Sequence, residues 1–119
     1  MVRSAVALAL GLVPAVASAQ APCQEIRFAP GASEGVVTGE VPADSSLCFT
    51  IEVGEGQHAE VSVEDLGPDV MIVTVPGVSE VQESIDWTTR AGIYEIRVMP
   101  LFRSRGYNAF RLRVAVSGG

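Results

Sequence analysis

Apolar and polar residues alternate along most of this chain in short runs. In residues 59–63 every second side chain is apolar and the ones between are charged or polar, and residues 94–98 repeat the pattern. A period of two places successive side chains on opposite faces of a β-strand. Prolines and glycines separate the runs and mark turns. The pattern predicts strands near residues 24–28, 34–41, 46–53, 57–65, 69–75, 83–88, 91–99 and 107–116.

Strands this short, with turns this frequent, indicate an all-β fold, an antiparallel β-sandwich of about eight strands. Residues 91–98 and 109–116 are expected to pair as a final β-hairpin. Residues 70–75 are apolar at every position except Thr74, which predicts a strand covered on both faces. One face of the final hairpin should be core, and its residues are Tyr94, Ile96, Val98, Phe110, Leu112, Val114 and Val116.

The first nineteen residues have the parts of a secretory signal peptide. Arg3 precedes an apolar stretch over residues 5–16, which Pro14 interrupts, and Ala17-Ser-Ala19 is a small-residue cleavage site before Gln20. The alternative, a retained membrane anchor, would need roughly 18 uninterrupted apolar residues. We therefore predict a periplasmic or secreted protein with no membrane span after cleavage. Its mature part, residues 20–119, has room for one domain and is expected to be a monomer.

Both cysteines lie in the mature part, and an even number of cysteines in an oxidising compartment predicts a disulfide. Cys23 and Cys48 can form only one intramolecular pair. The period of two places each of them on the polar, outward face of its strand. A redox-active pair is the alternative, but the Cys-x-x-Cys spacing typical of that chemistry is absent from the sequence. The sequence predicts a structural crosslink.

Charge is distributed unevenly along the chain, which has a net charge of −6 and no lysine. Residues 20–86 contain thirteen acidic residues and one arginine, Arg27, whereas residues 87–119 contain six arginines and one acid, Glu95. Removal of Arg3 with the leader makes the mature chain more acidic still. This balance disfavours nucleic acid as a partner and favours a basic protein. A surface of two signs is typical of a binding protein.

Residues suited to catalysis are few. His58 is the single histidine, and as an exposed residue at a strand start it offers no nucleophile–base pair. The acidic residues between 52 and 69 lack the spacing of a calcium loop, so solvated faces are expected rather than a metal site, although related sandwiches sometimes hold calcium. Trp87 could stack on a sugar or pack in the core, and packing is favoured. We predict no enzyme activity, no cofactor and no metal.

The connection between the last two strands, residues 99–106, is the candidate binding site. Leu101 and Phe102 have no strand to bury them, and Arg103 and Arg105 follow at once. Apolar anchors beside guanidinium groups concentrate binding energy at interfaces. The alternative is structural, with Phe102 folded back over the end of the sandwich. The predicted binding residues are Arg97, Leu101, Phe102, Arg103, Arg105 and Tyr107.

Several short motifs occur in a fixed order along nearly the whole mature chain. They are Phe28-x-x-Gly31, Val37-x-Gly39, Phe49-Thr-Ile-Glu-Val53, Ala91-Gly-Ile-Tyr-Glu-Ile-Arg-Val98 and Phe110-Arg-Leu-Arg-Val114. Together they resemble the bacterial pre-peptidase C-terminal domain. The resemblance implies a jelly-roll-like sandwich that usually accompanies a secreted enzyme. A stand-alone exported version resembles the periplasmic inhibitors of goose-type lysozyme, from which this chain departs in its shorter Arg-rich connection and its cysteine pair.

Two functions from different classes follow from this resemblance and from the loop. The first is a periplasmic, non-catalytic inhibitor that occludes the active site of a lysozyme-like muramidase through residues 99–106. The second is an envelope module that binds cell-wall polymer or another exported protein without inhibiting it. Fold transfers more safely than function between proteins that share a sandwich.

Overall fold

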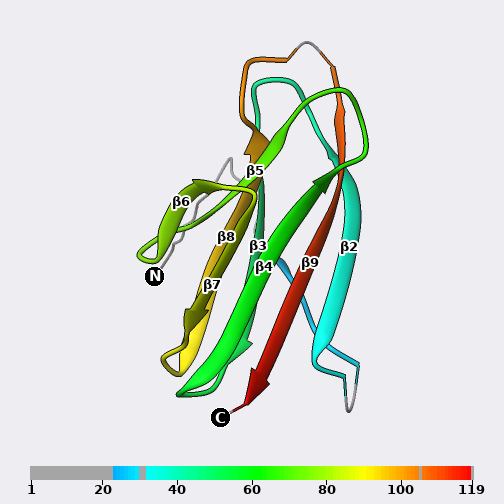
Figure 1. The fold of residues 1–119 in the computed structure, drawn as a ribbon. Coiled ribbons are helices and arrows are strands. Elements are labelled where there is room, and N and C mark those ends of the chain that lie inside the picture. The colour runs from blue at the N-terminus through cyan, green and yellow to red at the C-terminus, as the bar shows by residue number, and fades with distance from the viewer. Residues whose placement is uncertain (1–22, 30–31, 105, 119) are drawn as a thin grey trace, which may run out of the picture.

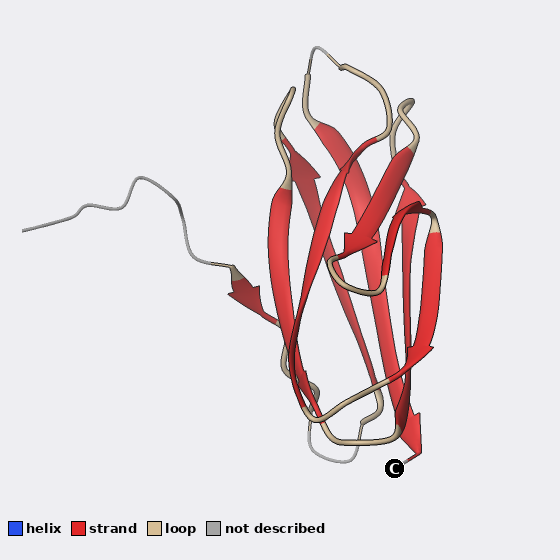
Figure 2. Ribbon diagram, turned by 90° about the vertical axis from the view of Figure 1, so that its left-hand side faces the viewer, coloured by secondary structure: helices blue, strands red, loops and turns tan. Residues whose placement is uncertain are grey.

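The protein folds into two β-sheets that face each other (Figures 1 and 2). The structure, a computed structural model, describes residues 23–29, 32–104 and 106–118, and every regular element in them is a strand. The strands are β1 (Gln24–Glu25), β2 (Glu34–Val41), β3 (Leu47–Val53), β4 (Gln57–Asp65), β5 (Met71–Val75), β6 (Ser79–Gln82), β7 (Ser84–Thr88), β8 (Gly92–Pro100) and β9 (Asn108–Gly118). The all-β sandwich is confirmed, with nine strands rather than about eight.

One sheet has the strand order β1-β3-β8-β5-β6 and the other has the order β2-β9-β4-β7. Neighbouring strands are antiparallel with one exception. The short edge strand β1 runs parallel to β3, through Gln24 and Glu25. The prediction of antiparallel pairing therefore holds for the described strands apart from β1.

The predicted final hairpin is wrong, because β8 and β9 belong to different sheets. β8 pairs with β3 and β5, whereas β9 pairs with β2 and β4. The connection between them, residues 101–107, crosses from one layer to the other (Figure 1). The arginines are divided accordingly. Arg97 is exposed on β8, and Arg111 and Arg113 are exposed on β9, in the opposite sheet.

The core fills the space between the sheets and takes its side chains from both. Phe49 and Phe110 meet across it edge to face, with ring centroids 6.3 Å apart. Most of the predicted core residues are buried, and Tyr94 is half-buried beside them. The predicted core residues that are buried are Ile96, Val98, Phe110, Leu112, Val114 and Val116. The alternation rule succeeds because each sheet turns one face of every strand toward the shared core.

β5 is covered on both faces, as its composition predicts. Met71, Val73 and Val75 belong to the core cluster, and Ile72, between them, is only 5% exposed. The edge strand β6, which the sequence pattern did not predict, pairs with β5 through an irregular register. In β6 Val81 has a φ of 57°, a backbone conformation that is unusual for a β-branched residue.

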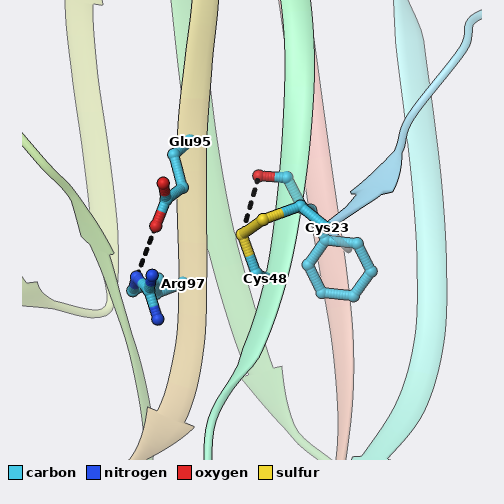
Figure 3. A network of polar contacts seen from close by, with 5 residues as sticks. Cys23, Cys48, Glu95 and Arg97 are labelled. Atoms are coloured by element: carbon cyan, nitrogen blue, oxygen red, sulfur yellow. Dashed lines mark hydrogen bonds and ion pairs between the residues drawn. A yellow bond between two sulfur atoms is a disulfide. The ribbon is translucent and has the colours of Figure 1, made fainter. Parts of the chain in front are cut away.

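The predicted disulfide joins Cys23 and Cys48, and it ties the residue before β1 to β3 (Figure 3). Beyond it, the N–H of Ile26 donates to the carbonyl of Thr50 at 2.9 Å. Phe28 then packs over Gly35 of β2, where a Cβ would lie 3.1 Å from the Phe28 ring. The crosslink therefore holds a segment that spans from the edge of one sheet to the edge of the other.

Replacing both Cys23 and Cys48 by serine should lower the free energy of unfolding by about 3 kcal/mol, because the crosslink restricts a closed loop of about 25 residues in the unfolded chain. Urea denaturation of the variant and of the oxidised wild type measures this loss. Intact mass after alkylation, without reductant, counts free thiols in protein purified from the periplasm. Two alkylated thiols there would contradict the crosslink.

The expected signal peptide, residues 1–19, lies outside the described residues, as does the start of the expected mature chain up to Pro22. Among the residues that are described, no helix is long and apolar enough to cross a membrane.

Candidate binding site at one end of the sandwich

Three connections lie together at one end of the sandwich, at the top of Figure 1. They are residues 42–46 between β2 and β3, 66–70 between β4 and β5, and 101–107 between β8 and β9. The N–H of Leu66 donates to the carbonyl of Ala109 at 3.0 Å, and the N–H of Leu101 donates to the carbonyl of Val70 at 2.8 Å. The predicted binding loop is therefore fastened to the β4–β5 connection at its start.

Large apolar side chains are exposed at this end. The exposed fractions are 40% for Leu101, 72% for Phe102, 70% for Tyr107 and 44% for Leu66. A Phe102 folded back over the sandwich would be mostly buried, so this structural alternative is wrong. Exposed aromatic side chains are typical of interfaces, where a few such residues supply most of the binding energy. Leu66 lies at the same end of the sandwich, where its N–H donates to the Ala109 carbonyl, and no local sequence pattern predicts this.

Arg103 follows Phe102 and is exposed. Most of the described arginines already pair with a glutamate. These pairs are Arg27 with Glu25, Arg97 with Glu95, Arg111 with Glu64 and Arg113 with Glu34. Within the part of the chain that the structure describes, Arg103 and Arg90 have no such partner. The guanidinium of Arg103 is thus available to a carboxylate of another molecule, and Arg105 lies outside the described residues.

Arg97, the predicted binding residue upstream of the loop, is in a different setting. It lies in β8 opposite Cys48 in the ladder with β3, and its guanidinium pairs with Glu95 of the same strand (Figure 3). Its side chain is 45% exposed. The structure therefore brings Leu101, Phe102, Arg103 and Tyr107 into one connection, with Arg97 outside it.

Asn108, which the sequence pattern did not single out, fixes the end of this connection. It is 2% exposed, and its Nδ2 lies 2.7 Å from Ser104 Oγ and 3.3 Å from the carbonyl oxygens of Val41 and Gly106. Buried side-chain amides are costly unless they are hydrogen-bonded. The signal that could have found it is a lone polar residue at an inward position of an otherwise apolar strand.

A shallow groove of about 450 Å³ adjoins the loop. Its apolar lining comes from Val70, Ile72, Val81 and Leu101, and residues 82–84 complete it. Leu101 lines the groove and is also one of the exposed apolar residues of the loop, so the groove borders the loop at its start. The edge strand β6 contributes Val81 to the lining of the groove.

Within residues 23–29, 32–104 and 106–118, neither the histidine nor the possible metal ligands form a second candidate site. The His58 Nε2 lies 3.9 Å from Asp86, and both side chains are more than half exposed. A grouping of possible metal ligands, Cys23, Cys48 and Glu95, contains the two cysteines of the disulfide, which leaves no thiolate to bind a metal. Trp87 packs edge to face on Tyr94 at 5.2 Å and borders the core, as the packing interpretation predicts.

The fold is a two-sheet sandwich, and its candidate binding surface lies at one end, on the exposed loop. No family model matches the chain, and no curated protein matches it. Solved structures do match it in fold, and their shared architecture agrees with both families that the sequence motifs resemble.

Two of these structures are PliG proteins, periplasmic inhibitors of g-type lysozyme. The Aeromonas hydrophila protein has a TM-score of 0.62 at 18% identity, over 80% of this chain and 96% of its own. The Salmonella Typhimurium protein has a TM-score of 0.59 at 17% identity, over 82% and 100%. The pre-peptidase C-terminal domain of a Bacillus anthracis collagenase has a TM-score of 0.53 at 14% identity, over 82% and 99%. At these identities the likeness establishes the fold.

Proposed function

We propose that this protein is an exported inhibitor of a lysozyme-like muramidase and that it blocks the enzyme with the connection between β8 and β9. One observation carries the proposal. The exposed rings of Phe102 and Tyr107 stand in the same short loop as the exposed Arg103, which pairs with no acidic side chain among the described residues. The fold shared with PliG proteins supports the choice of target.

The chemistry of the loop suits a glycosidase cleft. Muramidases act through carboxyl groups at the scissile bond, in a cleft that binds a chain of sugars. A guanidinium forms two parallel hydrogen bonds with a carboxylate, and aromatic rings stack where sugar rings would lie. Arg103, with Arg105 two residues on, would pair with the acidic groups while Phe102 fills the adjoining subsite. Inhibition is then occlusion, with no covalent step.

The charge of the rest of the molecule would assist the encounter. The chain has a net charge of −6, and all 14 of its acidic residues lie outside residues 101–107. Lysozymes that are basic would be attracted to this surface, which raises the association rate and makes it sensitive to salt. The predicted signal peptide would place the protein where cell-wall hydrolases act, in the periplasm or the medium.

A second candidate is an envelope-binding module, and one observation favours it. The same fold occurs as the accessory domain of a collagenase, and exposed Phe102 and Tyr107 could stack on a wall polysaccharide. The two functions differ in what they require of the partner. An inhibitor needs an enzyme with an open cleft, whereas a polymer-binding module should be retained by purified peptidoglycan alone.

The mature domain should slow the clearing of a bacterial cell-wall suspension by goose-type lysozyme in a turbidity assay. Chicken-type and invertebrate-type enzymes, assayed in parallel, establish the class. Inhibition should saturate near one inhibitor per enzyme, because occlusion needs one loop per cleft. Sedimentation of the domain with purified peptidoglycan, in the absence of enzyme, tests the second candidate. Undiminished clearing by all three enzymes would overturn the inhibitor proposal.

A further inference from the structure

Asn108 occupies a position that the fold otherwise reserves for apolar residues. It is the first residue of β9, and it belongs to the inward-facing row that continues with Phe110, Leu112, Val114 and Val116. All the others in this row are apolar and buried. Its own Oδ1 is buried and has no hydrogen-bond partner among the described residues. A polar side chain held there at such a cost needs a reason.

The hydrogen bonds of Asn108 supply that reason. Its Nδ2 faces the carbonyl of Val41 at the end of β2, the hydroxyl of Ser104 in the middle of the loop, and the carbonyl of Gly106 near the loop's end. Two of these three neighbours, Val41 in β2 and Gly106 in the loop, present carbonyls, which only accept hydrogen bonds, so they orient the amide with its N–H groups toward them. One buried side chain thus links the strand layer to two points of residues 101–107.

Few other hydrogen bonds hold the described residues of the loop to the sandwich. Its start is held by the hydrogen bond between Leu101 N–H and the Val70 carbonyl. Phe102, Arg103 and Tyr107, between this bond and Asn108, are exposed and gain little from packing. Exposed rings and guanidinium groups bind more tightly if they are ordered in advance, because ordering on contact subtracts from the affinity.

We infer that Asn108 is the positioning residue of the binding loop. Its side-chain amide holds Ser104 and Gly106 from inside the sandwich, so that Phe102 and Arg103 are presented in one arrangement before the partner arrives. The inference rests on the proposed function for its effect on inhibition. Its effect on the loop itself can be measured without any partner.

Asn108→Leu tests the anchor, because leucine suits the apolar row but donates no hydrogen bond. Thr89→Val is the matched control. Thr89 is also 2% exposed, and its hydroxyl bonds the Gly54 carbonyl at 2.6 Å and the Gln57 N–H at 3.0 Å, at the opposite end of the sandwich. The rate of trypsin cleavage measures how easily the loop opens, because trypsin cleaves after Arg103 and Arg105. The fragment masses identify which bond is cut.

Asn108→Leu should raise the rate of tryptic cleavage after Arg103 and Arg105 by about tenfold, since losing these hydrogen bonds favours local opening. Thr89→Val should leave that rate unchanged even if it lowers global stability, which urea denaturation measures for both. If Asn108→Leu fails to fold, Ser104→Ala decides, because it removes the 2.7 Å bond from the loop side and leaves the core intact. Wild-type cleavage rates in the folded Asn108 variant, or in Ser104→Ala, would overturn the inference.

The inhibition assay separates this inference from the proposed function. If the wild type inhibits a lysozyme, Asn108→Leu should weaken inhibition by about tenfold while Thr89→Val inhibits normally. Phe102, Arg103 and Arg105 are unchanged in both variants, so the difference reports their arrangement. If the wild type inhibits no lysozyme, the proposed function fails. Faster cleavage of the loop would still establish Asn108 as its anchor.

Discussion

Replacing Phe102, Arg103 and Arg105 together by alanine should abolish inhibition of the partner enzyme and leave the free energy of unfolding nearly unchanged. Phe102 is 72% exposed and Arg103 has no acidic partner among the described residues, so their removal leaves no cavity and no unpaired charge in the free protein. In the complex the same side chains would supply the apolar anchor and the bidentate bonds. Affinity is measured by calorimetry, and stability by urea denaturation.

Single substitutions distinguish the center of the interface from its rim. If Arg103 pairs with a carboxylate that becomes buried in the complex, Arg103→Ala should cost about 2–5 kcal/mol of binding free energy, mainly through faster dissociation. At the rim, the same change would mainly slow association, and the difference would shrink at high salt. Arg103→Lys keeps the charge but loses the planar fork, so it should restore only part of the affinity.

Arg111 and Arg113 provide the matched control for charge. Their replacement by alanine removes two positive charges from the exposed face of β9, where they pair with Glu64 and Glu34. This double variant should inhibit like the wild type. If the triple loop variant instead binds with wild-type affinity, the loop is not the binding element. The acidic outer face of β4, with Glu60 and Glu64, would then be the next surface to test.

Local patterns in the sequence predicted the strands well, because alternation and turn residues act over a few positions. β2 and β4 begin and end at the predicted residues, and the buried residues of β8 and β9 have the predicted parity. The disulfide between Cys23 and Cys48 could be predicted because the chain has two cysteines and is expected in an oxidising compartment. The strands and their parity depend on residues that are close in the sequence. The disulfide depends on a pairing for which the two cysteines allow only one solution.

Pairing between strands depends on the whole fold, and here the sequence misled. Two strands paired in a hairpin and two strands in facing sheets both bury every second side chain in the core. The alternating pattern of β8 and β9 therefore could not distinguish the two arrangements. The consequence for function is large. The six C-terminal arginines do not form one cationic face, since Arg97 and Arg111 pair with glutamates on opposite sheets. The candidate site is reduced to the loop.

Two parts of the site's surroundings had no sequence signal strong enough to find them. β6 contains Val81 at positive φ, which breaks the alternation that marks a strand. Leu66 comes from a connection distant in sequence, and its N–H donates to the carbonyl of Ala109 at the exposed end. Long-range hydrogen bonds of this kind follow from tertiary packing and leave no local pattern.

Ile96→Ala should lower the free energy of unfolding by about 2–5 kcal/mol, enough to unfold much of a marginally stable domain. Ile96 is fully buried in β8, in the core cluster with Phe49 and Phe110, so truncation leaves a cavity between the sheets. Urea denaturation, followed by tyrosine and tryptophan fluorescence, gives the change in the midpoint.

Ile93 is the matched control, because it is the same residue type in the same strand with the opposite parity. It is 70% exposed, so Ile93→Ala should change the free energy of unfolding by less than about 0.5 kcal/mol. The contrast between the two variants tests the register of β8 directly, since a slip of one residue exchanges the inward and outward faces. A larger loss for Ile93→Ala than for Ile96→Ala would show that β8 is turned the other way. The loop that follows β8 would then present a different set of side chains to the partner.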